Sequence, residues 1–256
     1  MALYTDIFGR LDWLTTRVKR LCCAVDKNTA AIAAAEVANP CYLEIVTDDV
    51  RSIQYRSLAD WNANTIWSTP FTAYVEIGDT IRLYGGSNVY LPANIFPNNL
   101  HLISINDGCG AITSLETGVF QDCSNLVYVN LPVLTEISGA AFYRCSGLTY
   151  INTPLATTIG FESFTLCTSL VSVSFPSATS LEYSVFDSCS VLTIVNLPVV
   201  TNLGGSPGLE YVFKSISGNI MTLTVPVAQQ FINSGNPDED IVYFLGNNPG
   251  STVNYI

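Results

Sequence analysis

The sequence has little positive charge, one histidine and no long apolar run. Its 10 lysine and arginine residues stand against 21 aspartate and glutamate residues, so the formal net charge is −11. Binding to nucleic acid or to an anionic membrane requires basic surface, and crossing a bilayer requires about 20 consecutive apolar residues. We therefore expect no nucleic-acid binding and no membrane insertion. Residues 1–20 also lack the pattern of a secretory signal, which predicts synthesis and folding in the cytosol.

Motifs that carry catalysis or hold cofactors are missing as well. No nucleophile motif or phosphate-binding glycine loop occurs, and the eight cysteines form no C-x-x-C pair. His101 is the only possible histidine base, and its apolar neighbours at 102–103 favour a structural role. The acidic run at 238–240 offers carboxylates to calcium, but a loop with this charge needs no ion. We expect no enzyme, no catalytic residue, no cofactor and no metal site.

Residues 1–40 differ from the rest of the chain in charge and in pattern. They hold five of the ten basic residues and four acidic ones, whereas acidic residues dominate the remainder. Their apolar residues recur at heptad spacing, which predicts an α-helix of the coiled-coil type that ends before Pro40. Packing of this helix on its own domain is the alternative, and the pattern leaves the number of associating chains open. The predicted anchor and oligomerisation residues are Leu11, Leu14, Val18, Leu21, Val25, Asn28 and Ile32.

Residues 41–110 are predicted to form a β-rich N-terminal cap. Segments 42–46, 71–77 and 80–84 are rich in β-branched and aromatic residues, which favours strands. Glycines at 78 and at 85–86 supply the turns beside these segments. The cap leads into a stretch with a regular repeat.

Residues 111–200 contain four blocks of 22 residues that align without a gap. Such a period is the mark of a solenoid, in which no single turn buries its own apolar face and stacking supplies the core. Residues 201–256 lose the rhythm, which predicts an irregular last turn and a C-terminal cap. Phenylalanine, cysteine, leucine and proline each keep one column, and these columns are Phe120, Phe142, Phe164 and Phe186; Cys123, Cys145, Cys167 and Cys189; Leu126, Leu148, Leu170 and Leu192; and Pro132, Pro154, Pro176 and Pro198.

Each block carries a version of the pattern L-x-x-L-x-L, which ends in a period-2 segment and predicts a short strand. Stacked turns place these strands side by side in a parallel sheet. The residues on either side of the middle apolar position then face solvent and form the candidate partner-binding face. An asparagine and serine ladder that only satisfies the sheet surface is the alternative. The face consists of Tyr128, Asn130, Tyr150, Asn152, Ser172, Ser174, Ile194 and Asn196.

Two further columns have plain structural interpretations. The cysteines, one per turn, are expected to be small buried thiols beside an internal ladder of phenylalanine rings. The acids Glu116, Glu136, Glu162 and Glu182 lie on different turns and are expected to be solvated. A glycosidase would need two carboxyl groups held at a defined separation across a cleft, which this spacing does not indicate.

The blocks resemble the BspA-like class of leucine-rich repeats found in microbial surface proteins. Residues 119–126 (VFQDCSNL) and 141–148 (AFYRCSGL) fit the core A-F-x-x-C-x-x-L of that class, and the likeness covers about 90 residues. The resemblance implies a leucine-rich-repeat solenoid with a parallel sheet, following the N-terminal helix.

The flanking segments are similar to repeat proteins of tailed phages of gut bacteria, the crAss-like group among them. The segments 59–62, 69–72 and 83–87 look like the cap of those proteins, and 222–226 and 235–241 look like their closing segment. This resemblance implies a bacteriophage virion component, a head or tail fibre that is usually trimeric. The segment 201–214 departs from the 22-residue rhythm, which fits the irregular last turn expected above.

These expectations define three hypotheses for function. In the first, residues 1–40 form a homotrimer or a dimer and dock on another virion protein, while the solenoid contacts a host cell-surface glycan or protein. In the second, the chain is a cellular surface adhesin. In the third, it is an enzyme that acts on polysaccharides, which the lack of an acid pair disfavours.

Overall fold

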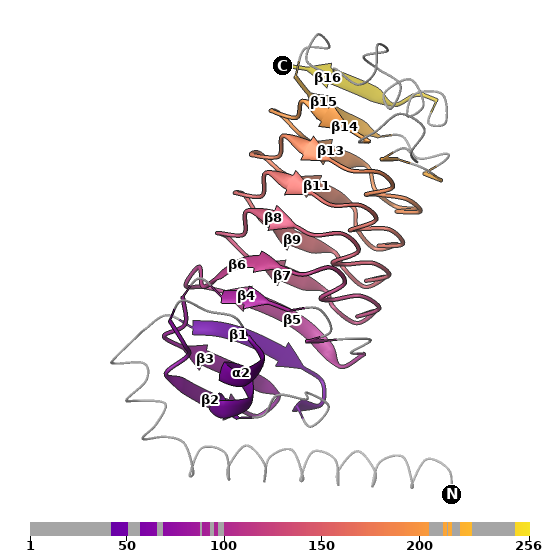
Figure 1. Cartoon of the computed structure of the whole chain (residues 1–256). Helices are drawn as coiled ribbons and strands as arrows, with labels where there is room; N and C mark the ends of the chain where they lie inside the picture. Colours follow the sequence, from indigo (N-terminus) through magenta and orange to yellow (C-terminus); the bar gives the residue numbers. More distant parts are fainter. Residues whose placement is uncertain are drawn as a thin grey trace, which may run out of the picture.

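The computed structural model describes residues 42–50, 57–65, 69–87, 89–92, 95–96, 100–204, 212–213, 215–216, 221–226 and 249–256. The predicted helical anchor over residues 1–40, with all its predicted oligomerisation residues, lies outside these described residues, and so does the acidic run at 238–240. Figure 1 shows the described chain as a stack of turns that continues from an N-terminal cap.

The N-terminal part of the described chain is rich in β-strands. Strand β1 (Tyr42–Thr47) pairs antiparallel with β3 (Thr80–Tyr84), which pairs antiparallel with β2 (Ala73–Ile77) through the turn at Gly78-Asp79. The short helix α2 (Leu58–Asn64) was not expected from the sequence. Ser57 caps this helix by accepting a hydrogen bond from the N–H of Asp60. Trp61 holds this helix against the core, because its side chain is fully buried there.

The cap leads directly into the solenoid through β1, which also pairs antiparallel with β5 (Leu102–Asp107). From β5 onward the pairing is parallel, as the repeat predicted. One sheet runs in the order β2-β3-β1-β5-β7-β9, with β7 at Tyr128–Asn130 and β9 at Tyr150–Asn152. A four-stranded sheet follows it along the stack, with β11 (Ser172–Ser174), β13 (Ile194–Asn196), β15 (Thr222–Val225) and β16 (Thr252–Tyr255).

A second side of each turn forms another parallel sheet, which the sequence analysis missed. Its order is β14-β12-β10-β8-β6-β4. Apart from β4 and β6, its strands are only two residues long, too short to show a period in the sequence. The apolar residue of each two-residue strand is buried. The exposed threonine directly before each of these strands donates a hydrogen bond to a carbonyl of the preceding turn, as Thr157 Oγ1 does to the carbonyl of Thr135 at 3.0 Å. These strands are β4 (Val89–Leu91), β6 (Ile112–Leu115), β8 (Glu136–Ile137), β10 (Thr158–Ile159), β12 (Ser180–Leu181) and β14 (Asn202–Leu203).

The phenylalanine column forms the predicted internal ladder. The rings of Phe120, Phe142, Phe164 and Phe186 stack with centroids 5.2, 5.3 and 5.8 Å apart and planes within 17° of parallel. Phe96 and Phe213 extend the ladder by one ring at each end, with centroids 5.5 and 5.8 Å from their neighbours. The sequence analysis missed both, because they fall outside the regular 22-residue spacing.

Each buried cysteine fastens one turn to the turn before it. The Sγ of Cys145 donates to the carbonyl of Phe120 at 3.0 Å, and Cys123, Cys167 and Cys189 make the equivalent contact at 3.1 to 3.2 Å. Burial raises the pKa of the Cys189 thiol to about 12. A buried thiol of this kind is an unreactive hydrogen-bond donor. Cys109 differs from this column, because it is disulfide-bonded.

The turn after residue 203 accommodates an insertion without ending the stack. Strand β15 pairs parallel with β13, and Val195 lies opposite Leu223. These two residues are 28 positions apart, six more than the 22-residue repeat. Leu223 and Val225 are fully buried, so they continue the core. One apolar core therefore runs from Leu43 in the cap to Val225.

Candidate binding face

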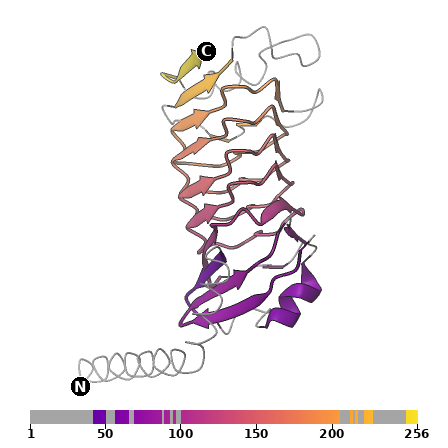
Figure 2. The ribbon, with the colours of Figure 1, turned by 90° about the vertical axis from the view of Figure 1, so that its left-hand side faces the viewer.

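The eight residues predicted to face a partner all lie on the outer side of β7, β9, β11 and β13. Within each of these strands the middle residue is buried and its two neighbours are at least partly exposed. The register aligns Tyr128 with Tyr150 and Ser172 with Ile194. Figure 2, turned by 90° from Figure 1, shows the same rungs stacked along the molecule. We call this surface the outer face.

Two tyrosines form the aromatic part of the outer face. The rings of Tyr128 and Tyr150 stack with centroids 5.0 Å apart and an angle of 5° between their planes. Tyr150 is 48% exposed and Tyr128 is 37% exposed. Because each ring covers one face of the other, the faces left open are those turned toward Ser104 and toward Ser172, the neighbours of the pair in the same column. Both neighbours are small.

The asparagine column has the structural role named as the alternative. The Nδ2 group of Asn130 donates to Oδ1 of Asn106, and Nδ2 of Asn152 donates to Oδ1 of Asn130, both at 2.7 Å. Further along, Nδ2 of Asn196 donates to the hydroxyl of Ser174 at 3.0 Å. These amides stabilise the sheet, and their remaining hydrogen-bonding capacity faces outward.

A third exposed column, which the sequence analysis missed, completes the outer face. It contains Val127, Thr149, Val171 and Thr193. Val171 is 50% exposed, and Thr149 Oγ1 bonds back to the carbonyl of Val127 at 3.1 Å. The signal was a valine or threonine directly after the buried leucine of each pattern, and only the fold shows which way this side chain points. No charged residue occurs in the three columns between β7 and β13.

The sheet of the outer face is interrupted between β9 and β11, and we call this interruption the seam. In the turns around it, Thr149 N–H donates to the carbonyl of Val127 at 3.0 Å, and Thr193 N–H to that of Val171 at 2.9 Å. The equivalent bond between Val171 N–H and the carbonyl of Thr149 is absent. On the same side, Phe175 N–H donates to the carbonyl of Asn196 at 3.0 Å. The equivalent bond between Thr153 N–H and the carbonyl of Ser174 is also absent.

The core beneath the seam is slightly open as well. Ile151 is 8% exposed and Val173 is 4% exposed, while Val129 and Val195, one turn away on either side, are fully buried. The remaining sides of these turns stay bonded, since Thr179 N–H donates to the carbonyl of Thr157 at 2.8 Å. These turns therefore lack their backbone hydrogen bonds on the outer face alone.

The sequence shows a cause for the seam. The inward column at the end of these strands reads Leu131, Thr153, Phe175 and Leu197, so a small polar side chain adjoins the largest apolar one where β9 meets β11. Thr153 is buried, and its hydroxyl has no hydrogen-bond partner. A buried hydroxyl without a partner costs about 1 to 3 kcal/mol.

A shallow groove lies beside the N-terminal ends of the same strands. Its volume is about 680 Å³, and its lining is Leu100, Asp122, Ser124, Arg144, Ser146, Leu166 and Thr168. Arg144 forms a long ion pair with Asp122, at 3.6 Å, and its guanidinium lies 5.1 Å from the centre of the Tyr143 ring. The groove therefore places an ion pair beside the uncharged columns of the outer face.

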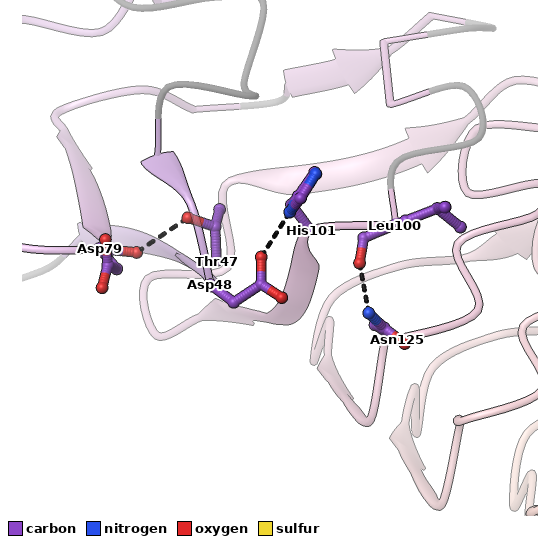
Figure 3. Close-up of polar contacts among 6 residues, drawn as sticks. All are labelled: Thr47, Asp48, Asp79, Leu100, His101 and Asn125. Carbon is purple, nitrogen blue, oxygen red and sulfur yellow. Dashed lines mark hydrogen bonds and ion pairs between the residues drawn. The ribbon is translucent and has the colours of Figure 1, made fainter. Parts of the chain in front are cut away.

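His101 takes part in contacts that join the cap to the first turn. Figure 3 shows its Nδ1 beside Oδ1 of Asp48, at 2.6 Å, and Asp48 N–H donates to the carbonyl of His101 at 2.9 Å. In the same view Asn125 Nδ2 donates to the carbonyl of Leu100, and Thr47 Oγ1 to that of Asp79. All of these contacts link consecutive turns or the cap strands, which is a structural role.

Of the glutamates singled out in the sequence, Glu116 and Glu136 both act on Tyr90, and Glu182 makes a contact of its own. Glu182 Oε2 accepts a hydrogen bond from the N–H of Phe161 at 2.9 Å. Burial, a hydrogen bond to Glu116 and the charge of Glu136 raise the pKa of Tyr90 to about 12. Within the described part of the chain, no group of three or more histidine, cysteine and acidic side chains could hold a metal ion. The described helices also include none long and apolar enough to cross a membrane.

Comparison with known proteins defines the family. The model of the BspA type leucine rich repeat region matches residues 89–232 in six copies. The chain is also similar to a leucine-rich repeat protein from Bacteroides ovatus ATCC 8483, with 20% sequence identity and a TM-score of 0.47. That match covers 65% of this chain and 39% of the other, so this chain spans well under half of that protein's length. No curated protein matches the sequence. Since the repeat model covers more than half of the chain, this protein belongs to the BspA-type leucine-rich repeat family.

Proposed function

We propose that the protein is a non-enzymatic binding and structural component of a bacteriophage virion, a head or tail fibre that presents the outer face to the host cell surface. The observation that carries the proposal is an uncharged, partly aromatic face on a rigid stack of turns. Tyrosine, serine and asparagine provide adaptable contacts at little cost in side-chain entropy. Solenoids commonly use such extended surfaces for recognition.

The virion assignment is supported by the similarity of the flanking segments to phage repeat proteins. In this proposal residues 1–40 associate with themselves, as a trimer or a dimer, and dock on another virion protein. Sedimentation should then show more chains per particle for the full chain than for a variant that begins at Cys41. Equal numbers of chains per particle would remove the anchor from the proposal.

Mass spectrometry of purified particles tests the virion assignment. The chain should be found in virions at a stoichiometry that fits a fibre. Its absence from particles, together with recovery from the envelope fraction of bacterial cells, would instead establish a surface adhesin. The adhesin is the second candidate because the disulfide at Cys109 is typical of proteins that work outside the reducing cytoplasm.

Replacement of the two exposed tyrosines tests the role of the outer face. The double variant Tyr128→Ala and Tyr150→Ala should adsorb to host cells at least tenfold more weakly than the natural chain. Leu155→Ala is the matched control, because Leu155 is 48% exposed like Tyr150 but lies outside the strands of the outer face. Unchanged adsorption of the double variant would refute a role for this face.

A further inference from the structure

We propose that the seam between β9 and β11 is a binding site for one ring of a neutral saccharide. The proposal rests on the function proposed above, since it names the ligand of the outer face. Three features of the seam carry it: an open aromatic ring face, free main-chain hydrogen-bonding groups, and the absence of charge.

The aromatic wall of the site is Tyr150. One face of its ring is covered by Tyr128, and the other is turned along the stack toward the seam. The next residue in that column is Ser172, which is too short to cover the ring, and the one after it is Ile194, which is 52% exposed. Two strand spacings, about 9.6 Å, therefore separate Tyr150 from Ile194. That interval accommodates one flat ring in contact with both side chains.

The floor of the site offers donors and acceptors together. The N–H of Val171 and the carbonyl of Thr149 have lost the bond that joins their equivalents in neighbouring turns. The hydroxyl of Ser172 is exposed, and that of Ser174 accepts from Asn196 and keeps its own proton to donate. Saccharide hydroxyl groups both donate and accept, so they match such a mixed set. The C–H face of a pyranose ring is apolar and suits the ring of Tyr150.

Charge selects against the other ligand classes. No charged side chain lies in the columns around the seam, so a buried anion or cation of the ligand would have no counter-charge. The whole chain carries a net charge of −11, which repels acidic polysaccharides. A neutral glycan meets neither penalty.

Isothermal titration of the full chain with defined oligosaccharides tests the site. The probes are six-unit oligomers of mannose, xylose and glucose, with an oligogalacturonate as the acidic counterpart. We expect at least one neutral probe to bind and the acidic probe to bind at least tenfold more weakly. Tyr150→Ala should weaken the neutral probe at least tenfold, and Ser172→Phe, which fills the interval, should abolish its binding. Leu155→Ala should bind within twofold of the natural chain.

Each other result overturns the proposal in a recognisable way. Binding of a neutral probe that is unaffected by both seam variants would place the saccharide elsewhere on the molecule. Adsorption to cells without binding of any neutral probe would refute the ligand class and leave the outer face as a protein-binding surface. Failure of the natural chain to adsorb to cells at all would refute the proposed function itself. Thermal unfolding of each variant shows whether a loss of binding reflects a loss of folding.

Discussion

At the scale of single residues, Thr153 departs from the apolar column in which it lies. Its position is occupied by leucine or phenylalanine in the other aligned turns, and its hydroxyl is buried without a partner. Thr165 provides a contrast, because its buried hydroxyl donates to the carbonyl of Ser184 at 2.6 Å. The two threonines carry the same buried hydroxyl group, and only that of Thr165 has a hydrogen-bond partner.

Replacement of these threonines by valine should therefore have opposite effects. Thr153→Val removes an unsatisfied hydroxyl and should raise the free energy of unfolding by about 1 kcal/mol. Thr165→Val leaves the carbonyl of Ser184 without its donor and should lower that free energy by about 1 kcal/mol. Urea unfolding of both variants measures the difference. Equal destabilisation by the two changes would contradict this description of Thr153.

Close approach of the backbone makes Gly160 a second sensitive residue. A Cβ atom added there would lie 2.5 Å from the backbone nitrogen of Gly139, one turn away, whereas one added at Gly108 would meet its nearest neighbour at 3.6 Å. Gly160→Ala must push two turns apart and should cost about 1 to 3 kcal/mol of unfolding free energy. Gly108→Ala should change it by less than about 0.5 kcal/mol. A tolerated alanine at 160 would show that the turns are less tightly stacked than described.

At the scale of structural elements, the column of thiols and phenylalanine carbonyls links the turns through the core. The folded chain holds the proton of Cys189 up to a pKa of about 12, whereas an unfolded cysteine releases it near 8.5. The stabilisation from this raised pKa is complete below pH about 8.5 and is lost as the pH rises toward 12.

Alkaline conditions should therefore weaken the fold through this column. Between pH 8 and pH 10 the Cys189 thiol alone should account for a loss of roughly 1 to 2 kcal/mol in unfolding free energy. Urea unfolding of the natural chain and of Cys189→Ala at both pH values isolates that share, since the variant should show a smaller loss. An identical loss in both proteins would mean that Cys189 titrates normally in the folded state.

How much of each element was predictable depended on the length of its pattern. The phenylalanine column and the strands at 128–130 and 150–152 followed from a period held over four turns. The strands of the second sheet, such as Glu136–Ile137, are too short to show an alternation of apolar and polar residues in the sequence. Phe213 stacks on Phe186 although the two residues are 27 positions apart and not 22, so the period gave no signal for its place in the ladder.

The candidate site was predictable in outline and not in detail. The alternation of exposed and buried residues located the outer face, and it placed the tyrosines on one surface. The seam was not predicted, although Thr153 already departed from the pattern in the sequence. A departure of one side chain shows where packing changes, but the loss of particular backbone bonds depends on the neighbouring turn, where Phe175 lies.

At the scale of the whole molecule, the solenoid separates stability from recognition. One apolar core runs from the cap into β15 and is the main source of stability, to which the asparagine amides of the outer face add inter-turn hydrogen bonds. The net acidity of the chain favours solubility and limits indiscriminate binding to anionic surfaces. The three columns of the outer face carry no charged residue although the chain as a whole is acidic, and this contrast is the basis of the proposed function.

Hydroxyl-radical footprinting of the full chain, with and without host cell envelopes, tests most directly whether the outer face is the recognition surface. Binding through the outer face should protect Tyr128, Tyr150 and Ile194 from oxidation and leave Leu155 and Val199, exposed outside its strands, as reactive as before. Protection of Leu155 and Val199 with unchanged labelling of the two tyrosines would contradict the account.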